Sequence, residues 1–291
     1  VVLAEPGDEP LPEGARESQD PVLVRAPLAG LRGHLGEFVA LASGADGESI
    51  DLAALYVSPT PRFDLVLDLQ AEPIHPAARP PLGYYATRGD ADALARALAE
   101  LPDLVGEFEK PRFFHYEPSL CAHDRSGLGG CTRCIDACST QAISSLGDLV
   151  QVDPYLCQGD GICTTVCPSG AMRYAFPSPR DLLGATRRLL KGYAQAGGTR
   201  PVLLLHDGEA GAALLAARAA ELPGNVLPLQ VEEISATGID VWLSALAYGA
   251  ESVRLLATPA IPPGTVAALD RQIGIAHALL AGMGHAASRL S

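Results

Sequence analysis

The stretch that decides the fold spans residues 157–167 and reads CQGDGICTTVC. It repeats the spacing of an earlier stretch, CTRCIDAC at residues 131–138, because in both the last two cysteines lie four positions apart. All seven cysteines of the 291-residue chain fall inside residues 121–167. Such clustering in a long chain favours metal binding over a disulfide framework, which is typical of short secreted chains. Zinc is the competing metal, and it would need closed sets of four ligands.

The cysteine window aligns on itself as a duplicated unit. Residues 116–121 (YEPSLC) match residues 152–157 (VDPYLC) at an offset of 36, and residues 134–143 match residues 163–172 at an offset of 29. The offsets differ by 36 − 29 = 7, so the first copy carries a seven-residue insertion within residues 122–130. Without the insertion, both copies follow the pattern C-x2-[C/D]-x2-C-x3-C.

This spacing is typical of chains that hold two iron-sulfur clusters. Three thiolates separated by two residues surround one cluster, and the fourth, three residues on, binds the other cluster. The pattern therefore predicts two sets of ligands that exchange one cysteine between the repeats. Cluster one is assigned Cys121, Cys131, Cys134 and Cys167, and cluster two is assigned Cys138, Cys157 and Cys163.

Asp160 stands where cluster two would find its remaining thiolate, at the position that matches Cys131. We favour the interpretation that Asp160 is a loop residue and that cluster two is a three-iron [3Fe–4S] species. The alternative keeps a [4Fe–4S] cluster with the Asp160 carboxylate or water on the fourth iron, because a hard oxygen ligand binds iron less firmly than thiolate but can hold it. A third interpretation, an open iron that activates a substrate, needs acid and base residues that the sequence does not identify.

The cysteine stretches resemble the two halves of bacterial dicluster ferredoxin domains, on residues 131–138 and 166–172. The resemblance implies a dicluster ferredoxin-like fold and electron transfer. The chain departs from that pattern in three places: the long loop between Cys121 and Cys131, Ser139 where proline usually follows the crossing cysteine, and Asp160. The first two departures leave cluster one in place, and the third bears on the nuclearity of cluster two, as in seven-iron ferredoxins.

A wider resemblance, from about residue 62 to about residue 282, is to the longer 4Fe–4S binding proteins of proteobacteria. It rests on residues 63–69 (FDLVLDL), 105–111 (VGEFEKP) and 204–207 (LLHD). The resemblance implies redox partner proteins, with formate dehydrogenase systems as the associated example. Those proteins often carry a further cysteine motif upstream, whereas residues 1–120 contain no cysteine.

The rest of the chain predicts an α+β fold with an α/β part. Residues 1–20 predict an acidic arm, residues 21–110 a β-rich module with a connecting helix that begins at Asp90, and residues 111–178 the dicluster ferredoxin domain. In residues 179–291 a helix capped by Ser178 precedes strands that alternate with helices, which predicts a small parallel-sheet α/β domain. The strands are expected at residues 22–24, 37–41, 65–67, 202–205, 226–229 and 253–256, and the C-terminal helices near 210–221, 239–248 and 264–281.

Two other features carry weaker signals. The turn HDGEAG at residues 206–211 has two glycines between a strand and a helix, where phosphate could bind helix N–H groups. Glu209 would repel a phosphate and the pattern is not GxGxxG, so we assign no flavin or NAD. His123 follows Cys121 by two residues, and because cluster one already has four thiolates, we expect it beside the cluster or at the surface.

Composition limits the partners. The formal charge is 21 − 34 = −13 with no compensating basic run, which argues against nucleic acid and anionic membranes and favours basic partners. No stretch approaches the roughly 18 uncharged apolar residues of a membrane span. The chain opens Val1-Val2 with no visible signal peptide, so we expect a cytoplasmic protein.

The sequence predicts chemistry only at iron, because it contains no hydrolase triad order, HExxH zinc motif or P-loop. We therefore predict an electron-transfer protein or subunit that passes single electrons between redox partners and has no activity of its own. The alternatives are an iron-sulfur enzyme with an open iron at Asp160, and a regulatory or structural iron-sulfur protein.

Overall fold

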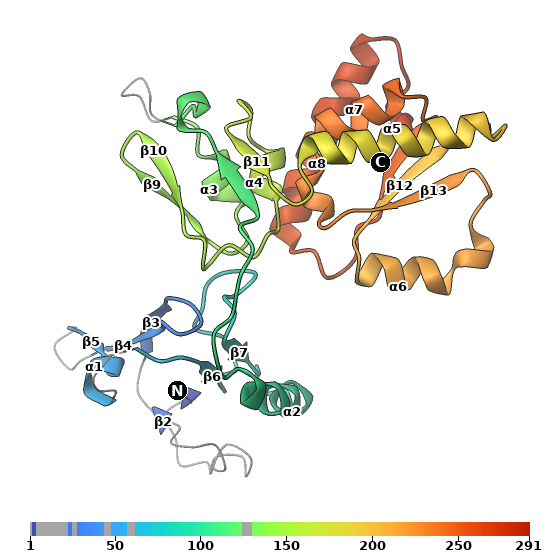
Figure 1. The fold of residues 1–291 in the computed structure, drawn as a ribbon. Helices are drawn as coiled ribbons and strands as arrows, with labels where there is room; N and C mark the ends of the chain where they lie inside the picture. Colours follow the sequence, from blue (N-terminus) through green and yellow to red (C-terminus); the bar gives the residue numbers. More distant parts are fainter. Residues whose placement is uncertain (1, 4–22, 25–27, 44–47, 57–61, 124–129) are drawn as a thin grey trace. The chain divides into compact units, whose positions relative to one another are not determined.

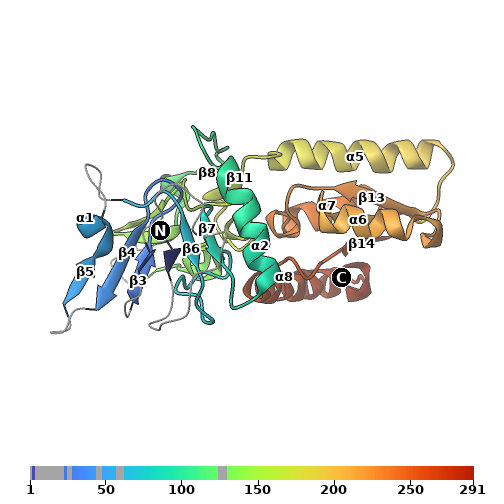
Figure 2. The same cartoon turned by 90° about the horizontal axis from the view of Figure 1, so that it is seen from below.

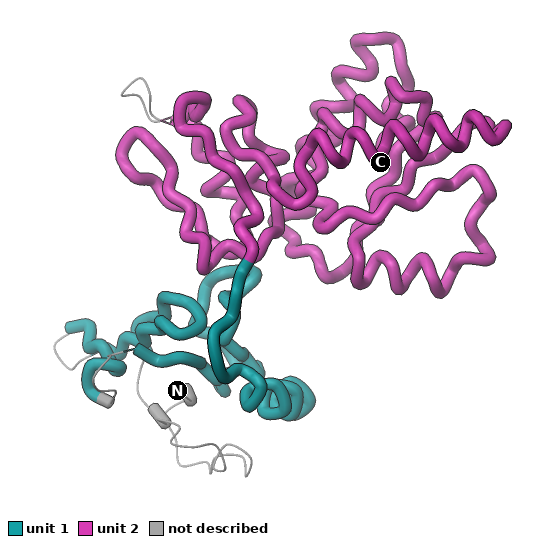
Figure 3. The backbone as a smooth tube through the Cα atoms, viewed as in Figure 1, with its two compact units in different colours: residues 1–110 teal, residues 111–291 magenta. Residues whose placement is uncertain are grey.

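The computed structural model describes residues 2–3, 23–24, 28–43, 48–56, 62–123 and 130–291. The chain divides into two compact units, Val1–Lys110 and Pro111–Ser291 (Figure 3). The predicted boundary between residues 178 and 179 falls inside the second unit. The predicted acidic arm lies outside the described residues except for Val2 and Leu3, which pair with two other strands.

The described residues of the first unit form two sheets. A parallel sheet has the order β2-β1-β6-β7 and consists of β1 (Val2–Leu3), β2 (Leu23–Val24), β6 (Val66–Asp68) and β7 (Tyr84–Ala86). An antiparallel sheet consists of β3 (Leu28–Arg32), β4 (Val39–Ser43) and β5 (Ser49–Asp51), with the short helix α1 (Leu52–Tyr56) after it. The strands expected at 22–24, 37–41 and 65–67 are therefore confirmed, with shifts of one or two residues at their ends.

The connecting helix α2 (Ala91–Glu100) begins and ends for local reasons. The Asp90 carboxylate accepts a hydrogen bond from the Asp92 N–H at 2.9 Å, which caps a free donor of the first turn. At the other end Pro102 cannot continue the helix, and the chain makes the short 3-10 turn Leu101–Asp103. The buried Ala97 packs against Leu67 of β6, so the helix covers one side of the parallel sheet.

The second unit begins with the duplicated segment. It contains two antiparallel strand pairs, β8 (Phe114–Tyr116) with β11 (Met172–Tyr174) and β9 (Ile143–Leu146) with β10 (Leu149–Val152). Two short helices follow cysteine-bearing loops, α3 (Arg133–Ala137) and α4 (Ile162–Thr165), as Figure 1 shows. A 3-10 turn, η3 (Pro118–Leu120), leads into Cys121.

The α/β part follows with the predicted alternation. After α5 (Pro179–Gln195) come β12 (Val202–His206), α6 (Ala210–Ala217), β13 (Val226–Gln230), α7 (Ile239–Ala247), β14 (Ser252–Leu255) and α8 (Pro263–Gly282). The three strands form a parallel sheet in the order β13-β12-β14, and 3-10 turns lie at Ala219–Glu221 (η4), Ile234–Ala236 (η5) and Ala287–Arg289 (η6). Figure 2 shows the two long helices, α5 and α8, running alongside this sheet.

Local chemistry explains this alternation. The Ser178 hydroxyl accepts a hydrogen bond from the Asp181 N–H at 3.3 Å, and Pro179 follows as the first residue of α5. The central strand β12 has neighbours on both edges, and its Leu203 and Leu205 are fully buried together with Trp242 of α7. Leu203 and Leu205 lie on the same face of the sheet, which the apolar core covers, whereas Val202 and Leu204 on the other face are partly buried.

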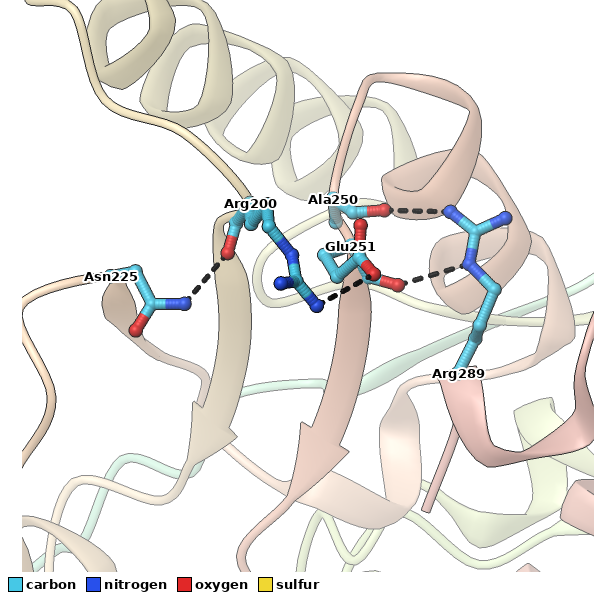
Figure 4. A network of polar contacts seen from close by, with 5 residues as sticks. All are labelled: Arg200, Asn225, Ala250, Glu251 and Arg289. Carbon is cyan, nitrogen blue, oxygen red and sulfur yellow. Dashed lines mark hydrogen bonds and ion pairs between the residues drawn. The ribbon is translucent and has the colours of Figure 1, made fainter.

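Polar contacts tie the amino ends of the parallel strands together (Figure 4). Asn225 Nδ2 donates to the Arg200 carbonyl oxygen at 2.7 Å, and the Arg200 guanidinium lies 3.5 Å from the Glu251 carboxylate. Arg289, near the C-terminus, donates from Nε to the Glu251 carbonyl at 2.9 Å and from Nη2 to the Ala250 carbonyl at 3.0 Å. These contacts fasten η6 to the start of β14.

The turn at residues 206–211 opens α6. Asp207 Oδ1 accepts hydrogen bonds from the N–H groups of Glu209 at 3.0 Å and Gly211 at 2.8 Å. The side chain thereby occupies the donors that a bound phosphate would require.

Over the part of the chain that the structure describes, no helix has both the length and the apolar character to cross a bilayer.

Candidate iron-sulfur site

Two strand pairs bring cysteines of different repeats together. Strand β8 leads towards Cys121 and strand β11 follows Cys167, and the two pair with Tyr116 opposite Met172. Strand β9 follows Cys138 and strand β10 precedes Cys157, and they pair with Ile143 opposite Val152. The pairing therefore brings the last cysteine of each repeat to the side of the first cysteine of the other.

The first predicted set of cysteines lines one cavity. The cavity encloses about 310 Å³, including space open to solvent, and its walls include Val150 and Met172. The cysteines that line it are the four assigned to cluster one, Cys121, Cys131, Cys134 and Cys167. Cys121 and Cys134 are buried, and the other two are partly exposed. The structure thus gathers one cysteine from the second repeat with three from the first.

The second predicted set lines another cavity of about 330 Å³. Apolar walls, including Phe114, Ile143 and Ile162, separate much of it from water. Its lining includes the three assigned cysteines and the aspartate, namely Cys138, Cys157, Cys163 and Asp160. The crossing cysteine here comes from the first repeat, which mirrors the arrangement in the first cavity.

The thiols of each set perturb one another. Burial, followed by the nearby Cys167, Cys131 and Cys121, raises the pKa of Cys134 to about 11. Burial is also the main cause that raises the pKa of Cys163 well above its ordinary value, and Cys138 and Cys157 are the next largest causes. Several thiolates gathered in a place of low dielectric repel one another, so each set favours a cationic partner.

Cys167 carries hydrogen bonds that stabilise its thiolate. The Met172 N–H lies 3.5 Å from Cys167 Sγ. Burial raises the pKa of this thiol, but hydrogen bonds from Met172, Ser169 and Ala171 outweigh burial and lower the pKa overall. Backbone N–H groups directed at a cysteine sulfur are the usual means by which a protein tunes an iron-sulfur cluster.

The arrangement of the cysteines bears on what the two sets could hold. Among the described residues, no three or more His, Cys, Asp and Glu side chains are grouped so that they could hold a single metal ion. A cluster needs a different arrangement, because each ligand binds a different iron and the sulfurs stand apart around the core. Two cysteine-lined cavities of similar size fit that requirement.

Asp160 has an asymmetric environment. The side chain is 7% exposed, and its Oδ2 accepts hydrogen bonds from Ser139 Oγ at 2.5 Å and Thr265 Oγ1 at 3.2 Å. Its Oδ1 is buried and has no hydrogen-bond partner among the described residues. A buried carboxylate oxygen without a donor is costly, so this oxygen has the character of a ligand atom in the second cavity.

The backbone around Asp160 is held on both sides. Gly159 and Gly161 have φ of +79° and +78°, a region that favours glycine. A Cβ at Gly161 would lie 2.4 Å from the Ala236 Cβ, and a Cβ at Gly159 would lie 2.7 Å from the Phe113 ring. The aspartate therefore sits in a loop whose flanking glycines admit close packing against η5 and Phe113.

His123 lies beside the first set, and its ring nitrogens form hydrogen bonds with oxygen atoms. Its Nδ1 lies 3.0 Å from the Cys131 carbonyl oxygen and its Nε2 lies 2.8 Å from Ser145 Oγ. The ring is buried, and both of its nitrogens are engaged. The ring therefore contacts the backbone of one of the cysteines of the first set.

Sequence reasoning identified Ser139 only as a departure from a pattern, and it missed Thr265. Thr265 lies in the first turn of α8, 105 positions after Asp160. No motif or spacing connects the two residues. The contact between Ser139 and Asp160 had one signal in the sequence, namely a serine beside the crossing cysteine where proline is usual.

Comparison with known proteins supports one part of this region directly. Residues 150–173 match the 4Fe-4S binding domain family. The matched stretch runs from β10 to β11 and contains Asp160 and three of the cysteines. It indicates at least one 4Fe-4S cluster and a role in iron-sulfur electron transfer. No curated protein and no solved structure matches the chain.

Proposed function

We propose that this chain is an electron-transfer iron-sulfur protein or subunit that holds two clusters, one in each cysteine-lined cavity. The observation that carries the proposal is the sorting of all seven cysteines into two cavities, each with one cysteine from the opposite repeat. When bound, iron-sulfur clusters supply one-electron redox chemistry. The chain's own residues bind, shield and tune them.

For cluster one, the ligands we propose are the four thiolates of the first cavity. Cys121, Cys131, Cys134 and Cys167 form a complete set for a [4Fe–4S] cluster. The Met172 N–H stabilises the crossing thiolate of this set. Exposed Arg133 and Pro168 line the cavity's rim, where a redox partner can approach.

For cluster two, we propose three thiolates and one carboxylate. Cys138, Cys157 and Cys163 supply sulfur, and Asp160 Oδ1 supplies oxygen to the fourth iron. The sequence alone favours a three-iron cluster at this position. The unpartnered Oδ1 favours the four-iron form, because an iron ligand would remove the free-energy cost of a buried oxygen without a donor.

The proposed partners are redox proteins, and a dehydrogenase of the formate type is the example that the sequence resemblance gives. A net charge of −13 favours a partner with a basic docking surface. An enzyme with an open iron is disfavoured, because Asp160 occupies the corner that a substrate would need.

Anaerobic iron and sulfide quantification, combined with EPR of the isolated and reduced protein, tests the proposal. We expect two cluster signals with distinct midpoint potentials and iron and sulfide in amounts that correspond to two clusters. Zinc near one equivalent with little sulfide, or a single cluster signal, would contradict it.

Paired serine substitutions test how the cysteines are shared. Cys167→Ser should perturb the cluster of Cys121, Cys131 and Cys134, although Cys167 lies only four residues after Cys163. The matched variant, Cys163→Ser, should perturb the other cluster and leave the first signal in place. Perturbation of the same cluster by both variants would mean that each repeat holds a local site.

A further inference from the structure

Two departures from the ferredoxin pattern touch each other. Ser139 replaces the usual proline after the first crossing cysteine, and Asp160 replaces a cysteine in the second repeat. Ser139 Oγ donates to Asp160 Oδ2 at 2.5 Å, and both side chains are buried. A proline at position 139 could not make this bond, since it has no side-chain donor. The two departures therefore form one structural unit.

A third member of this unit comes from the α/β part. Thr265 lies in the first turn of the 20-residue helix α8, and its hydroxyl donates to the same Oδ2 at 3.2 Å. Thr265 is 1% exposed, so water does not compete for the bond. The amino end of a helix also favours a nearby negative charge. The carboxylate is therefore held by a helix that lies outside both cysteine repeats.

The backbone of Asp160 is fixed from the same direction. Ser235 Oγ in η5 donates to the Asp160 carbonyl oxygen, and Thr165 Oγ1 of α4 donates to the Ser235 carbonyl at 2.6 Å. Tyr174 donates to the Gly159 carbonyl at 2.7 Å. With the backbone held and Oδ2 occupied by two hydroxyls, Oδ1 is the one carboxylate oxygen that remains for the cavity.

We propose that Ser139 and Thr265 are positioning residues that hold Asp160 so that Oδ1 binds the corner iron of cluster two. The inference rests on the proposed function and gives the α/β part a role in it. Helix α8 determines how firmly cluster two binds its fourth iron. Removal of a residue that hydrogen-bonds to a metal ligand typically lowers the metal affinity by about 10–100-fold. Without Thr265 the carboxylate can rotate, and Oδ1 no longer faces one fixed direction.

The test uses the full-length, cluster-loaded protein and Fe²⁺ as the probe. Cluster two is first converted to the three-iron form by mild oxidation, reduced by one electron, and titrated with Fe²⁺ under anaerobic conditions. The reduced three-iron core and one Fe²⁺ together contain all the atoms and electrons of the oxidised four-iron core. Iron forms bonds to three sulfides and Oδ1, and loss of the low-field EPR signal of the reduced three-iron cluster measures uptake without a second oxidation.

The variants separate the effect of the Thr265 hydroxyl donor from the effect of the side chain's shape. Thr265→Val removes the donor and keeps the shape, and we expect an Fe²⁺ affinity lower by about 10-fold. Thr265→Ser keeps the donor and should restore the affinity. The matched control is Thr258→Val, because Thr258 is also buried in the same part of the chain and its hydroxyl has no hydrogen-bond partner among the described residues. It should titrate like the wild type.

A second variant tests whether Thr265 acts through the Asp160 carboxylate. In Asp160→Cys, the thiolate binds iron without help from the hydroxyls, so adding Thr265→Val should not change the affinity further. A double-mutant cycle of this kind measures the coupling between the two positions. The midpoint potential of cluster one is an internal reference and should stay constant in all variants.

The outcomes separate the inference from the proposed function. Two results would overturn the inference and leave the proposed function standing, provided that the protein holds two clusters. In the first, Thr265→Val and Thr258→Val change the Fe²⁺ affinity equally. In the second, cluster two of the wild type takes up no Fe²⁺. A protein that contains fewer than two clusters before any conversion would overturn the proposed function itself.

Discussion

Two buried aspartates, one in each unit, show opposite uses of the same side chain. Asp68 at the end of β6 is fully buried, and both of its oxygens accept two hydrogen bonds. The donors are Gln70 N and Nε2 at 3.0 Å each, Ile74 N at 3.0 Å and the Tyr84 hydroxyl at 2.5 Å. Asp160 is buried almost as deeply, yet one of its oxygens has no partner.

The two carboxylates differ in how far hydrogen bonds compensate for their burial. A carboxylate whose acceptor sites are filled stabilises the chain around it, because its desolvation is offset by charge-assisted hydrogen bonds. A carboxylate with an oxygen left open beside three thiols lacks that compensation until a cation binds. The unsatisfied atom, and not the burial, distinguishes the two.

The largest expected effect is on the first unit. Asp68→Ala leaves a tyrosine hydroxyl and two backbone N–H groups without their acceptor, and we expect the free energy of unfolding of this unit to fall by about 4 kcal/mol. Far-UV circular dichroism reports both units, whereas the single Trp242 is buried in the second unit and reports that one by fluorescence. The loss should therefore appear in the dichroism and not in the fluorescence transition. Equal shifts in both would mean that Asp68 does not act within its own unit.

A smaller effect is expected from Tyr84→Phe, which removes one hydrogen bond to the Asp68 carboxylate and should lower the stability of the first unit by about 2 kcal/mol. Burial, and then the hydrogen bond to Asp68, raises the pKa of Tyr84. Above about pH 10 the unfolded tyrosine loses its proton while the folded one keeps it, so stability falls as pH rises.

The variant should show less of this alkaline loss than the wild type, although Tyr85, whose pKa is also raised, retains part of it. Urea denaturation at a series of pH values between neutral and alkaline checks the slope. Parallel curves for the two proteins would contradict the assignment to Tyr84.

The smallest effect on stability is expected from Asp160→Ala in the cluster-free protein. The variant leaves the hydroxyls of Ser139 and Thr265 without their acceptor, but it also removes a buried oxygen that has no donor. The two effects oppose each other, so we expect a change within about 1 kcal/mol. The same substitution in the loaded protein should convert cluster two to the three-iron form, which EPR detects. A stability loss as large as that of Asp68→Ala would remove the contrast between the two residues.

Much of the fold could be predicted because its signals are local. Asp90 and Ser178 mark the starts of α2 and α5 by their capping chemistry, and both helices begin there. The apolar runs of the C-terminal part predict parallel strands, and β12, β13 and β14 are parallel. The cysteine sets follow from a duplication that the sequence displays, although the ligand assignment itself stays a prediction.

The rest depends on contacts that local patterns do not encode. Val2 and Leu3 lie in an acidic segment, and only pairing with Leu23 and Leu67 makes them a strand. Thr265 touches Asp160 because α4 and α8 pack together, and a threonine in the first turn of a helix has many other uses. Such contacts depend on the three-dimensional fold and leave no spacing rule in the chain.

The pairing of β8 with β11 also affects how the duplicated segment could be moved between proteins. Phe114 lies opposite Tyr174, so the chain enters and leaves this segment at neighbouring points. A segment with adjacent ends can be inserted into a surface loop of another protein without stretching its host. Such a graft would transfer every cysteine and Ser139 but leave Thr265 behind. The transplanted segment would therefore have the complete first site and a second site whose aspartate has lost one of its two hydroxyl donors.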